Sequence, residues 1–150
     1  MKKLLLSLFI IPLSLISQTT AIPDTIFEQA LINLGYDNGT PDGTVPTSNI
    51  SSVVMLNVSS LSITDLTGIE GFIALNTLYC YGNQISSLDL RQNINLIDVD
   101  CSGNPLISLF ITDLNSLLWL YCDFCQLDTL DVSTNINIEV SKNRFLKTTS

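Results

Sequence analysis

The chain has 150 residues, a formal net charge of −8 and no histidine. Phosphate backbones and anionic lipids would repel so acidic a chain, which argues against nucleic acids and membrane surfaces as partners. Without histidine there is no Ser-His-Asp or Cys-His arrangement, and no Gly-rich phosphate loop is present, so the composition does not predict an enzyme.

Residues 1–21 have the three parts of a secretory signal peptide. Two lysines precede an apolar run over 4–16, and small polar residues follow it up to Ala21. The run is interrupted by Pro12 and is shorter than the ~20 residues that a membrane-spanning helix needs, so a transmembrane anchor is the weaker interpretation. The sequence predicts a secreted or cell-surface chain, with no membrane insertion after the signal is cleaved.

Residues 22–49 are predicted to form an N-terminal helical cap. The segment IPDTIFEQALINLG has Thr25 and Glu28 at the spacing of a capping box and ends at Gly35, which suits a helix C-terminus. We expect a helix over 24–34, followed by the turn-rich connector YDNGTPDGTVPTSN. The apolar stripe of this helix comprises Ile26, Phe27, Ala30, Leu31 and Leu34.

The connector also contains Asp37, Asn38 and Asp42, whose oxygen atoms raise calcium binding as an alternative. Their spacing is not that of an EF-hand loop, which carries its ligands at alternating positions. A plain turn is the favoured interpretation, and the sequence predicts no cofactor and no metal site.

Three consecutive segments of 21 residues, over 75–95, 96–116 and 117–137, share one pattern, L-x-x-[LV]-x-C-x-x-[NC]-x-[IL]-x-x-L-x-[LIV]. A leucine pattern with a fixed period of this length is the signature of leucine-rich repeats. The sequence therefore predicts a leucine-rich-repeat solenoid of about five coils over 50–145, followed by a tail at 146–150.

Degenerate copies flank these segments. The copy over 53–74 is one residue longer, and a last copy fits the pattern only if about two residues are missing before Ile138. One strand in each copy gives parallel strands centred near 56, 78, 99, 120 and 139. We expect these strands on the concave side, with irregular or 3-10 segments or short second strands on the convex side.

Side chains in the repeated strands should alternate between the core and the surface. Successive strand residues point to opposite sides, so Leu78 and Cys80 are expected inside, and Thr77, Tyr79 and Tyr81 outside. One coil cannot bury its own leucines, and stacked coils therefore share a continuous core.

Asparagines recur in the turn after the strand, at Asn83, Asn104 and Asn143. A buried turn cannot leave its backbone donors and acceptors unpaired. An asparagine side chain offers both a donor and an acceptor, so we expect these residues to bond the backbone of adjacent coils.

Cysteines occupy structural positions of the same pattern. Cys80, Cys101 and Cys122 recur at an inward strand position, and Cys125 takes the place of the turn asparagine. We expect four free, slow-reacting thiols that fill the core. Disulfide bonds are an alternative in an exported chain, and metal ligation is a weaker one because no histidine accompanies the cysteines.

The outward strand positions carry acidic and aromatic residues, including the one tryptophan of the chain. Such a surface suits a protein, peptide or glycan ligand, although the same side chains could simply pack across the strands and cover the sheet. Asp98 and Asp100 are ~7 Å apart on one strand face, but a flat sheet gives a glycosidase-like pair no pocket, so no catalytic residue is predicted. The predicted ligand-binding residues are Tyr79, Tyr81, Asp98, Asp100, Trp119, Tyr121 and Asp123.

With these residues placed, the chain resembles secreted bacterial leucine-rich-repeat proteins of the internalin-like type over about 22–145. The segment FEQALINLGYDNGTPDGTVPTSNI is similar to the cap that precedes such arrays, and ITDLTGIEGFIALNTLYC and LYCYGNQISSLDLRQNINL are similar to their repeats. The resemblance implies a non-enzymatic, extracellular or surface-associated module that binds through its concave sheet.

The C-terminal segment RFLKTTS contains no recognisable cap for the last coil. An uncovered last strand is an edge at which chains associate. A second hypothesis is therefore that the chain is a structural or spacer fragment of a larger cell-surface assembly, which self-associates through its open C-terminal edge.

Overall fold

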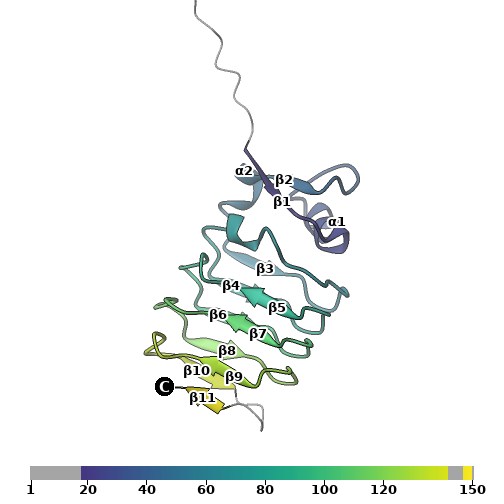
Figure 1. The fold of residues 1–150 in the computed structure, drawn as a ribbon. Coiled ribbons are helices and arrows are strands. Elements are labelled where there is room, and N and C mark those ends of the chain that lie inside the picture. The colour runs from purple at the N-terminus through teal and green to yellow at the C-terminus, as the bar shows by residue number, and fades with distance from the viewer. Residues whose placement is uncertain (1–17, 142–146, 150) are drawn as a thin grey trace, which may run out of the picture.

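The computed structural model describes residues 18–141 and 147–149, and these form a stack of coils beneath an N-terminal cap (Figure 1). Parallel strands from successive coils make the five-stranded principal sheet. Its strands are β3 (Met55–Asn57), β4 (Thr77–Tyr79), β6 (Asp98–Asp100), β8 (Trp119–Tyr121) and β10 (Glu139–Ser141). The predicted leucine-rich-repeat solenoid is confirmed.

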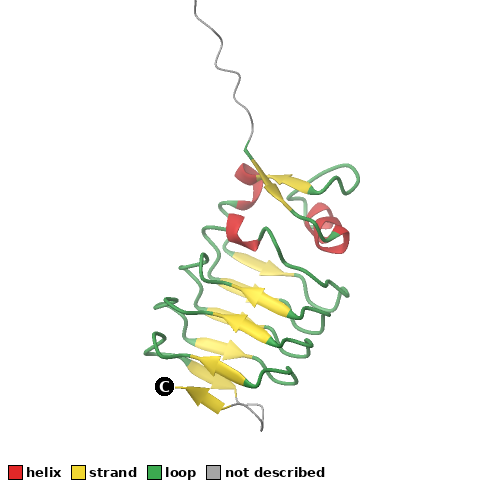
Figure 2. Cartoon of the chain, viewed as in Figure 1, coloured by secondary structure: helices red, strands yellow, loops and turns green. Residues whose placement is uncertain are grey.

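Short strands also form on the opposite, convex side of the coils, where Figure 2 shows a second layer of strands joined to the first by loops. β5 (Ser87–Asp89) pairs in parallel with β7 (Ser108–Phe110), and β9 (Thr129–Asp131) pairs with β11 (Lys147–Thr149). The first coil has the 3-10 helix η1 (Ile69–Gly71) between its concave strand and the next coil. Both predicted forms of convex structure are therefore present.

The core lies between these two layers. Leu56, Leu78, Val99 and Leu120 are partners in neighbouring concave strands, and all four are buried. The residues on either side of each of them are exposed or half-buried, as the alternation of a strand predicts. A shift by one residue would bring polar side chains into the core, so this alternation fixes the register.

The last coil departs from the sequence prediction. β10 pairs Glu139 with Trp119 and Val140 with Leu120, so this repeat is one residue shorter than the period of 21. We expected about two missing residues and a strand centred near 139, whereas one residue is missing and β10 is centred on Val140, one residue later. The preceding turn keeps its spacing, because Asn135 accepts the backbone N–H of Ile138, so the deletion lies between turn and strand.

The cap contains helix α1 (Thr25–Asn33), and its N-cap is Asp24 rather than Thr25. Asp24 Oδ1 accepts the backbone N–H groups of Ile26 and Phe27, each at 2.9 Å. Glu28 is buried and accepts the N–H groups of Asp42 at 2.7 Å and Gly43 at 2.8 Å. The predicted capping box is therefore wrong, because Glu28 holds the connector instead of the helix start.

The apolar stripe of α1 is narrower than the sequence predicts. Phe27, Ala30 and Leu31 are buried, whereas Ile26 and Leu34 are 42 % and 47 % exposed. Phe27 stacks on Phe72 of the first coil, with 6.5 Å between the ring centroids. The cap thus closes the N-terminal end of the core with one aromatic contact and a few aliphatic ones.

A small antiparallel sheet completes the cap, with β1 (Thr19–Ala21) paired to β2 (Thr44–Pro46) and the short helix α2 (Thr47–Ile50) following. The carbonyl of Gln18 accepts the N–H of Thr47. Gly68 of the first coil has a φ of 102°, and a Cβ there would lie 2.5 Å from the carbonyl oxygen of Ala21. The predicted signal peptide overlaps β1, while its residues 1–17 lie outside the described part.

Asp24 also joins the cap to the first coil. Its Oδ2 accepts the backbone N–H and the hydroxyl of Thr64, both at 2.8 Å, and the N–H of Asp65 at 3.1 Å. Partial burial alone would raise the pKa of this carboxyl, but its hydrogen bonds outweigh burial and lower the pKa below its usual value. Ionised Asp24 therefore stabilises the folded chain.

We expect Asp24→Ala to lower the free energy of unfolding by about 2 kcal/mol at neutral pH, because it removes both a helix cap and a tertiary link. A lowered folded pKa means that this stabilisation is complete above the unfolded pKa of ~3.9 and is lost as pH falls through the folded pKa. Urea unfolding of both chains between pH 2 and 7 measures the difference. Equal losses from Asp24→Ala and the exposed control Asp128→Ala would contradict this role.

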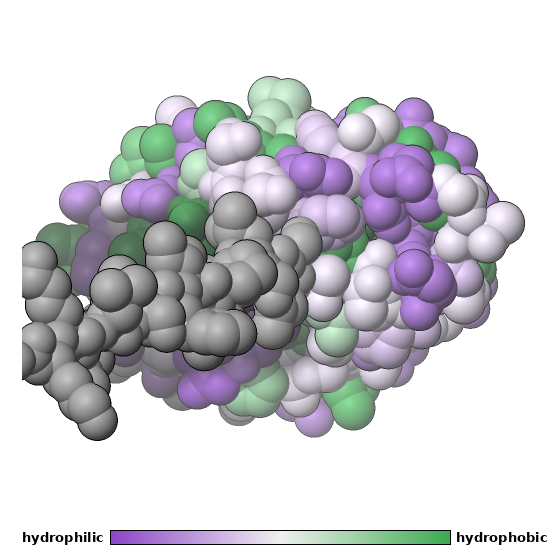
Figure 3. Space-filling view, turned by 90° about the horizontal axis from the view of Figure 1, so that it is seen from above, coloured by the Kyte–Doolittle hydropathy of each residue, from purple (hydrophilic) through white to green (hydrophobic). Residues whose placement is uncertain are grey.

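No helix within the described ranges is long and apolar enough to cross a membrane. Figure 3, which views the molecule from the cap end, shows small hydrophobic areas separated by hydrophilic ones outside the grey atoms. That view offers no broad apolar surface.

Candidate functional site

The concave face consists of the outward side chains of the principal sheet, and the parallel register arranges them in columns across the strands. Neighbouring strands are ~4.8 Å apart, so successive members of a column can contact one ligand. The first column is Met55, Thr77, Asp98, Trp119 and Glu139. The second column is Asn57, Tyr79, Asp100 and Tyr121.

All seven predicted ligand-binding residues belong to this side of the sheet. Five of them lie in the two columns, and Tyr81 and Asp123 follow their strands by two residues, where the backbone bonding between coils continues. Trp119, Tyr121 and Tyr81 are each 42 % exposed. The remaining four predicted residues are half-buried. Glu139, which the sequence did not predict here, is exposed beside Trp119.

Polar contacts hold the middle of the concave face. The hydroxyl of Tyr79 donates to Asp98 Oδ2 at 2.9 Å, and Asp100 Oδ1 accepts the N–H of Ser102 at 3.0 Å. The bond to Asp98, together with the charges of Asp98 and Asp100, raises the pKa of Tyr79. Asp98 Oδ1 is buried and has no hydrogen-bond partner among the residues that the structure describes.

Asparagine side chains fix the turns behind this face, as predicted. Asn104 donates to the carbonyls of Cys80 and Cys101 at 3.0 and 2.9 Å, and it accepts the N–H of Ile85 at 3.1 Å. Asn83 makes the corresponding bonds one coil earlier. Both side chains are buried, so no water replaces these bonds. The third predicted residue, Asn143, lies outside the described residues.

A second set of buried asparagines was not predicted. Asn93 donates to the carbonyls of Ile69 and Phe72, and Asn135 donates to those of Ile111 and Leu114. The two asparagines are two repeat periods apart in the sequence, which could have indicated a shared role. Leu114 occupies the equivalent position in the repeat between them and obscures the pattern. This second set ties the turns before the concave strands to the preceding coils.

Cys80, Cys101 and Cys122 form a buried column, and none of these three or Cys125 is in a disulfide bond. Burial raises the pKa of Cys80 and raises that of Cys122 to about 12. Cys125 is half-buried, and a hydrogen bond from the Cys101 thiol lowers the pKa of Cys125. Among the described residues, no group of three or more Cys, Asp or Glu side chains is arranged to hold a metal ion.

Because Cys125 is less buried than the other three cysteines, we now expect one faster-reacting thiol and three slow ones instead of four slow thiols. The thiolate is the reactive form, so the half-buried Cys125 should react first with a thiol reagent in the native chain. In denaturant without reductant, all four cysteines should react. Cys125→Ser should remove the fast phase and leave three slow equivalents. Titration of two or fewer thiols in denaturant would mean that disulfides exist.

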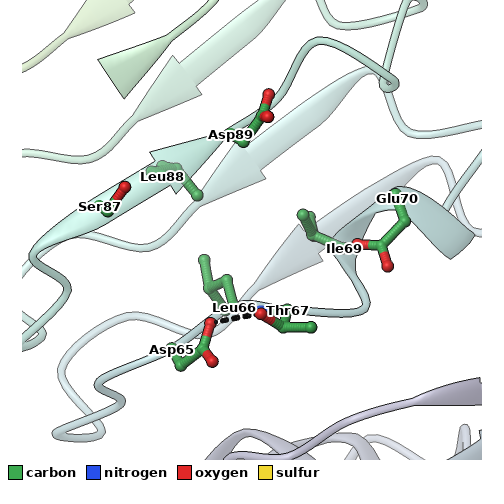
Figure 4. Close-up of a pocket in the computed structure, with 8 residues that line it drawn as sticks. All are labelled: Asp65, Leu66, Thr67, Ile69, Glu70, Ser87, Leu88 and Asp89. Carbon is green, nitrogen blue, oxygen red and sulfur yellow. Dashed lines mark hydrogen bonds between the residues drawn. The ribbon is translucent and has the colours of Figure 1, made fainter. Parts of the chain in front are cut away.

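A hollow of about 290 Å³ lies away from these residues, between the first coil and β5 on the convex side (Figure 4). Its carboxylates already have partners: Asp65 accepts the N–H and hydroxyl of Thr67, Glu70 accepts the N–H of Gly68, and Asp89 forms an ion pair with Arg91 at 2.6 Å. These bonds fix local turns. The concave face, with its exposed aromatic rings, is therefore the stronger candidate site.

No protein-family model matches this sequence, and no curated protein matches it. Among solved structures, the chain is similar to the functional domain of InlJ from Listeria monocytogenes, which includes a cysteine ladder. The two chains are 32 % identical with a TM-score of 0.76, and the match covers 88 % of this chain and 30 % of that one. Internalin C2 from Listeria monocytogenes is 21 % identical, with a TM-score of 0.62, over 90 % of this chain and 72 % of that one, and shows the fold alone. The chain thus spans less than a third of the InlJ domain.

Proposed function

We propose that this chain, an internalin-like leucine-rich-repeat protein, is a non-enzymatic module that binds a protein, peptide or glycan ligand through its concave face. The observation that carries the proposal is the exposure of Trp119 and Tyr121 on β8, beside a fully buried Leu120. Large aromatic side chains left partly in water on a regular sheet offer apolar area and a polar edge to a partner. Such residues dominate the binding energy of many interfaces.

The scaffold behind the face supports the same function. Backbone and asparagine bonds join each coil to the next, so the columns are fixed before a ligand arrives. A preorganised surface loses little conformational entropy on binding. The carboxylates of Asp98 and Asp100 are held by Tyr79 and Ser102 on an open sheet, an arrangement that suits hydrogen bonding to a ligand better than proton transfer.

For localisation, we propose export to the cell surface or the medium. The basic and apolar residues of 1–17 carry the signal. Cleavage after Ala21 would remove β1 and its bonds to β2, so we place the cleavage before Gln18. The intact mass of the exported chain tests this boundary. A chain that begins at Ile22 and melts at the same temperature would contradict it.

A second candidate function is a structural or spacer role with self-association through the C-terminal edge. It rests on β10 and β11, which among the described strands each pair with one neighbour, β8 and β9 respectively. Analytical ultracentrifugation discriminates the two functions. Discrete self-association favours the spacer role, whereas a stable monomer favours the ligand-binding module.

A protein and glycan array probed with the labelled chain tests the main proposal. The matched probes are the double variant Trp119→Ala/Tyr121→Ala, which truncates the concave face, and Phe110→Ala, which truncates an exposed ring on the convex side. Spots that bind the wild type and Phe110→Ala but not the double variant are the expected result. Spots that bind the double variant but not Phe110→Ala would contradict the proposal, because they would place the ligand site on the convex side.

A further inference from the structure

We propose that the ligand of the concave face presents a lysine or arginine side chain, which binds over the indole of Trp119 between Asp98 and Glu139. The inference rests on the proposed function, because it specifies the chemistry of the partner at the same face. It follows from the arrangement of these three residues and from a second pair on the convex side.

The first column carries a carboxylate on each side of the tryptophan. Asp98 on β6 and Glu139 on β10 are the register partners of Trp119 on β8. At ~4.8 Å per strand, each carboxylate lies beside the ring that it flanks. A cation placed over an indole face is attracted by the ring and can bond both carboxylates at once.

The convex side contains a carboxylate and an aromatic ring that bind a cation in this way. Asp89 on β5 and Phe110 on β7 are register partners, which is the same carboxylate and aromatic arrangement on adjacent parallel strands. The guanidinium of Arg91 bonds both oxygens of Asp89, at 2.9 and 2.6 Å, and lies 5.2 Å from the centroid of the Phe110 ring. This chain therefore already holds one arginine between a carboxylate and the aromatic ring that is its register partner.

Among the described residues, no cation of the chain itself lies beside Trp119, Asp98 and Glu139. The basic residues in the described ranges are Arg91, which follows β5, and Lys147 in β11, and both segments are on the convex side. Asp98 has one oxygen bonded by the neutral hydroxyl of Tyr79 and one buried oxygen without a partner. No positively charged side chain among the described residues bonds Asp98, so its attraction for a cation is left to a ligand.

The charge of the surrounding face favours the same partner. Asp100 and Asp123 add carboxylates to those of Asp98 and Glu139, and the hydrogen bond to Asp98, with the charges of Asp98 and Asp100, raises the pKa of Tyr79 on the same face. Attraction between this face and a basic segment would speed association and weaken with salt. An arginine fits best, because its planar guanidinium can stack on the indole and bond carboxylates at the same time.

The test is selection of peptides from a random phage-displayed library on the immobilised chain. The peptide that is enriched most is then synthesised with each arginine replaced by citrulline or each lysine by norleucine, which removes the charge. Binding is measured on the wild type, on Trp119→Ala, on Asp98→Asn/Glu139→Gln and on Asp89→Asn as the convex control. Melting curves check that the variants are folded.

We expect enrichment of basic residues, and a loss of affinity of about tenfold or more both on neutralising the peptide and in Asp98→Asn/Glu139→Gln, with Asp89→Asn unchanged. Peptides without basic residues whose binding depends on Trp119 would overturn this inference and leave the proposed function intact. A selection that yields no peptide dependent on Trp119 would count against both.

Discussion

Replacing Asn104 by leucine lowers the free energy of unfolding by about 3 kcal/mol. The change removes the donor to two carbonyls and the acceptor of the Ile85 N–H, all in a buried turn where water cannot replace them. Each buried group left without a partner costs about 1–3 kcal/mol, and partial relaxation of the turn offsets part of the total. Urea unfolding of the two chains measures the loss as a lower midpoint.

The natural exception in the same position provides the matched control. Cys125 replaces the asparagine in the next coil, where its thiol donates weakly to the carbonyl of Cys101 at 3.5 Å. Cys125→Asn should restore the missing bonds and raise the stability by about 1 kcal/mol. If Asn104→Leu is neutral, or if Cys125→Asn destabilises as much as Asn104→Leu, the asparagines do not hold the coils together.

Trp119→Ala weakens the binding of any ligand found on the array by about tenfold or more, with little change in melting temperature. A truncated interface anchor commonly costs ~2 kcal/mol of binding energy, whereas loss of cross-strand packing on an exposed face costs ~0.2–1 kcal/mol of stability. Tyr79→Ala should act in the same direction, because it removes a second ring and the donor to Asp98. Titration calorimetry and thermal melting of each variant separate the two effects.

Phe110→Ala is the control for that comparison, since its exposed ring lies on the convex side against Arg91. The Phe110→Ala variant should bind the ligand with the affinity of the wild type. A large loss of stability without a loss of affinity in Trp119→Ala would mean that the aromatic residues only cover the sheet.

The repeat made the solenoid predictable. Three copies at a period of 21 residues fix which strand positions are inward, and inward leucines and cysteines leave the aromatic and acidic residues for the surface. The columns of the concave face followed from that alternation alone. The repeat period did not predict the position of the deletion in the degenerate last copy. Glu139 was therefore not expected beside Trp119.

The cap was predicted less well because tertiary contacts decide its details. Thr25 and Asp24 both fit an N-cap by local spacing, but only Asp24 also bonds Thr64 and Asp65 of the first coil. Glu28 suits a capping box locally, yet the connector uses both of its oxygens. β1 has only three residues and overlaps the end of the predicted signal peptide. A strand this short shows no periodic pattern in the sequence, so its pairing with β2 was not predicted.

The most direct test of concave-face binding is the solvent exposure of Trp119 in the presence of a ligand from the array. It is the one tryptophan of the chain, and 42 % of its surface is exposed, so acrylamide quenching of the fluorescence reports on this site alone. A saturating ligand should shield the indole and lower the quenching constant. A quenching constant that stays the same at saturation would contradict binding through the concave face.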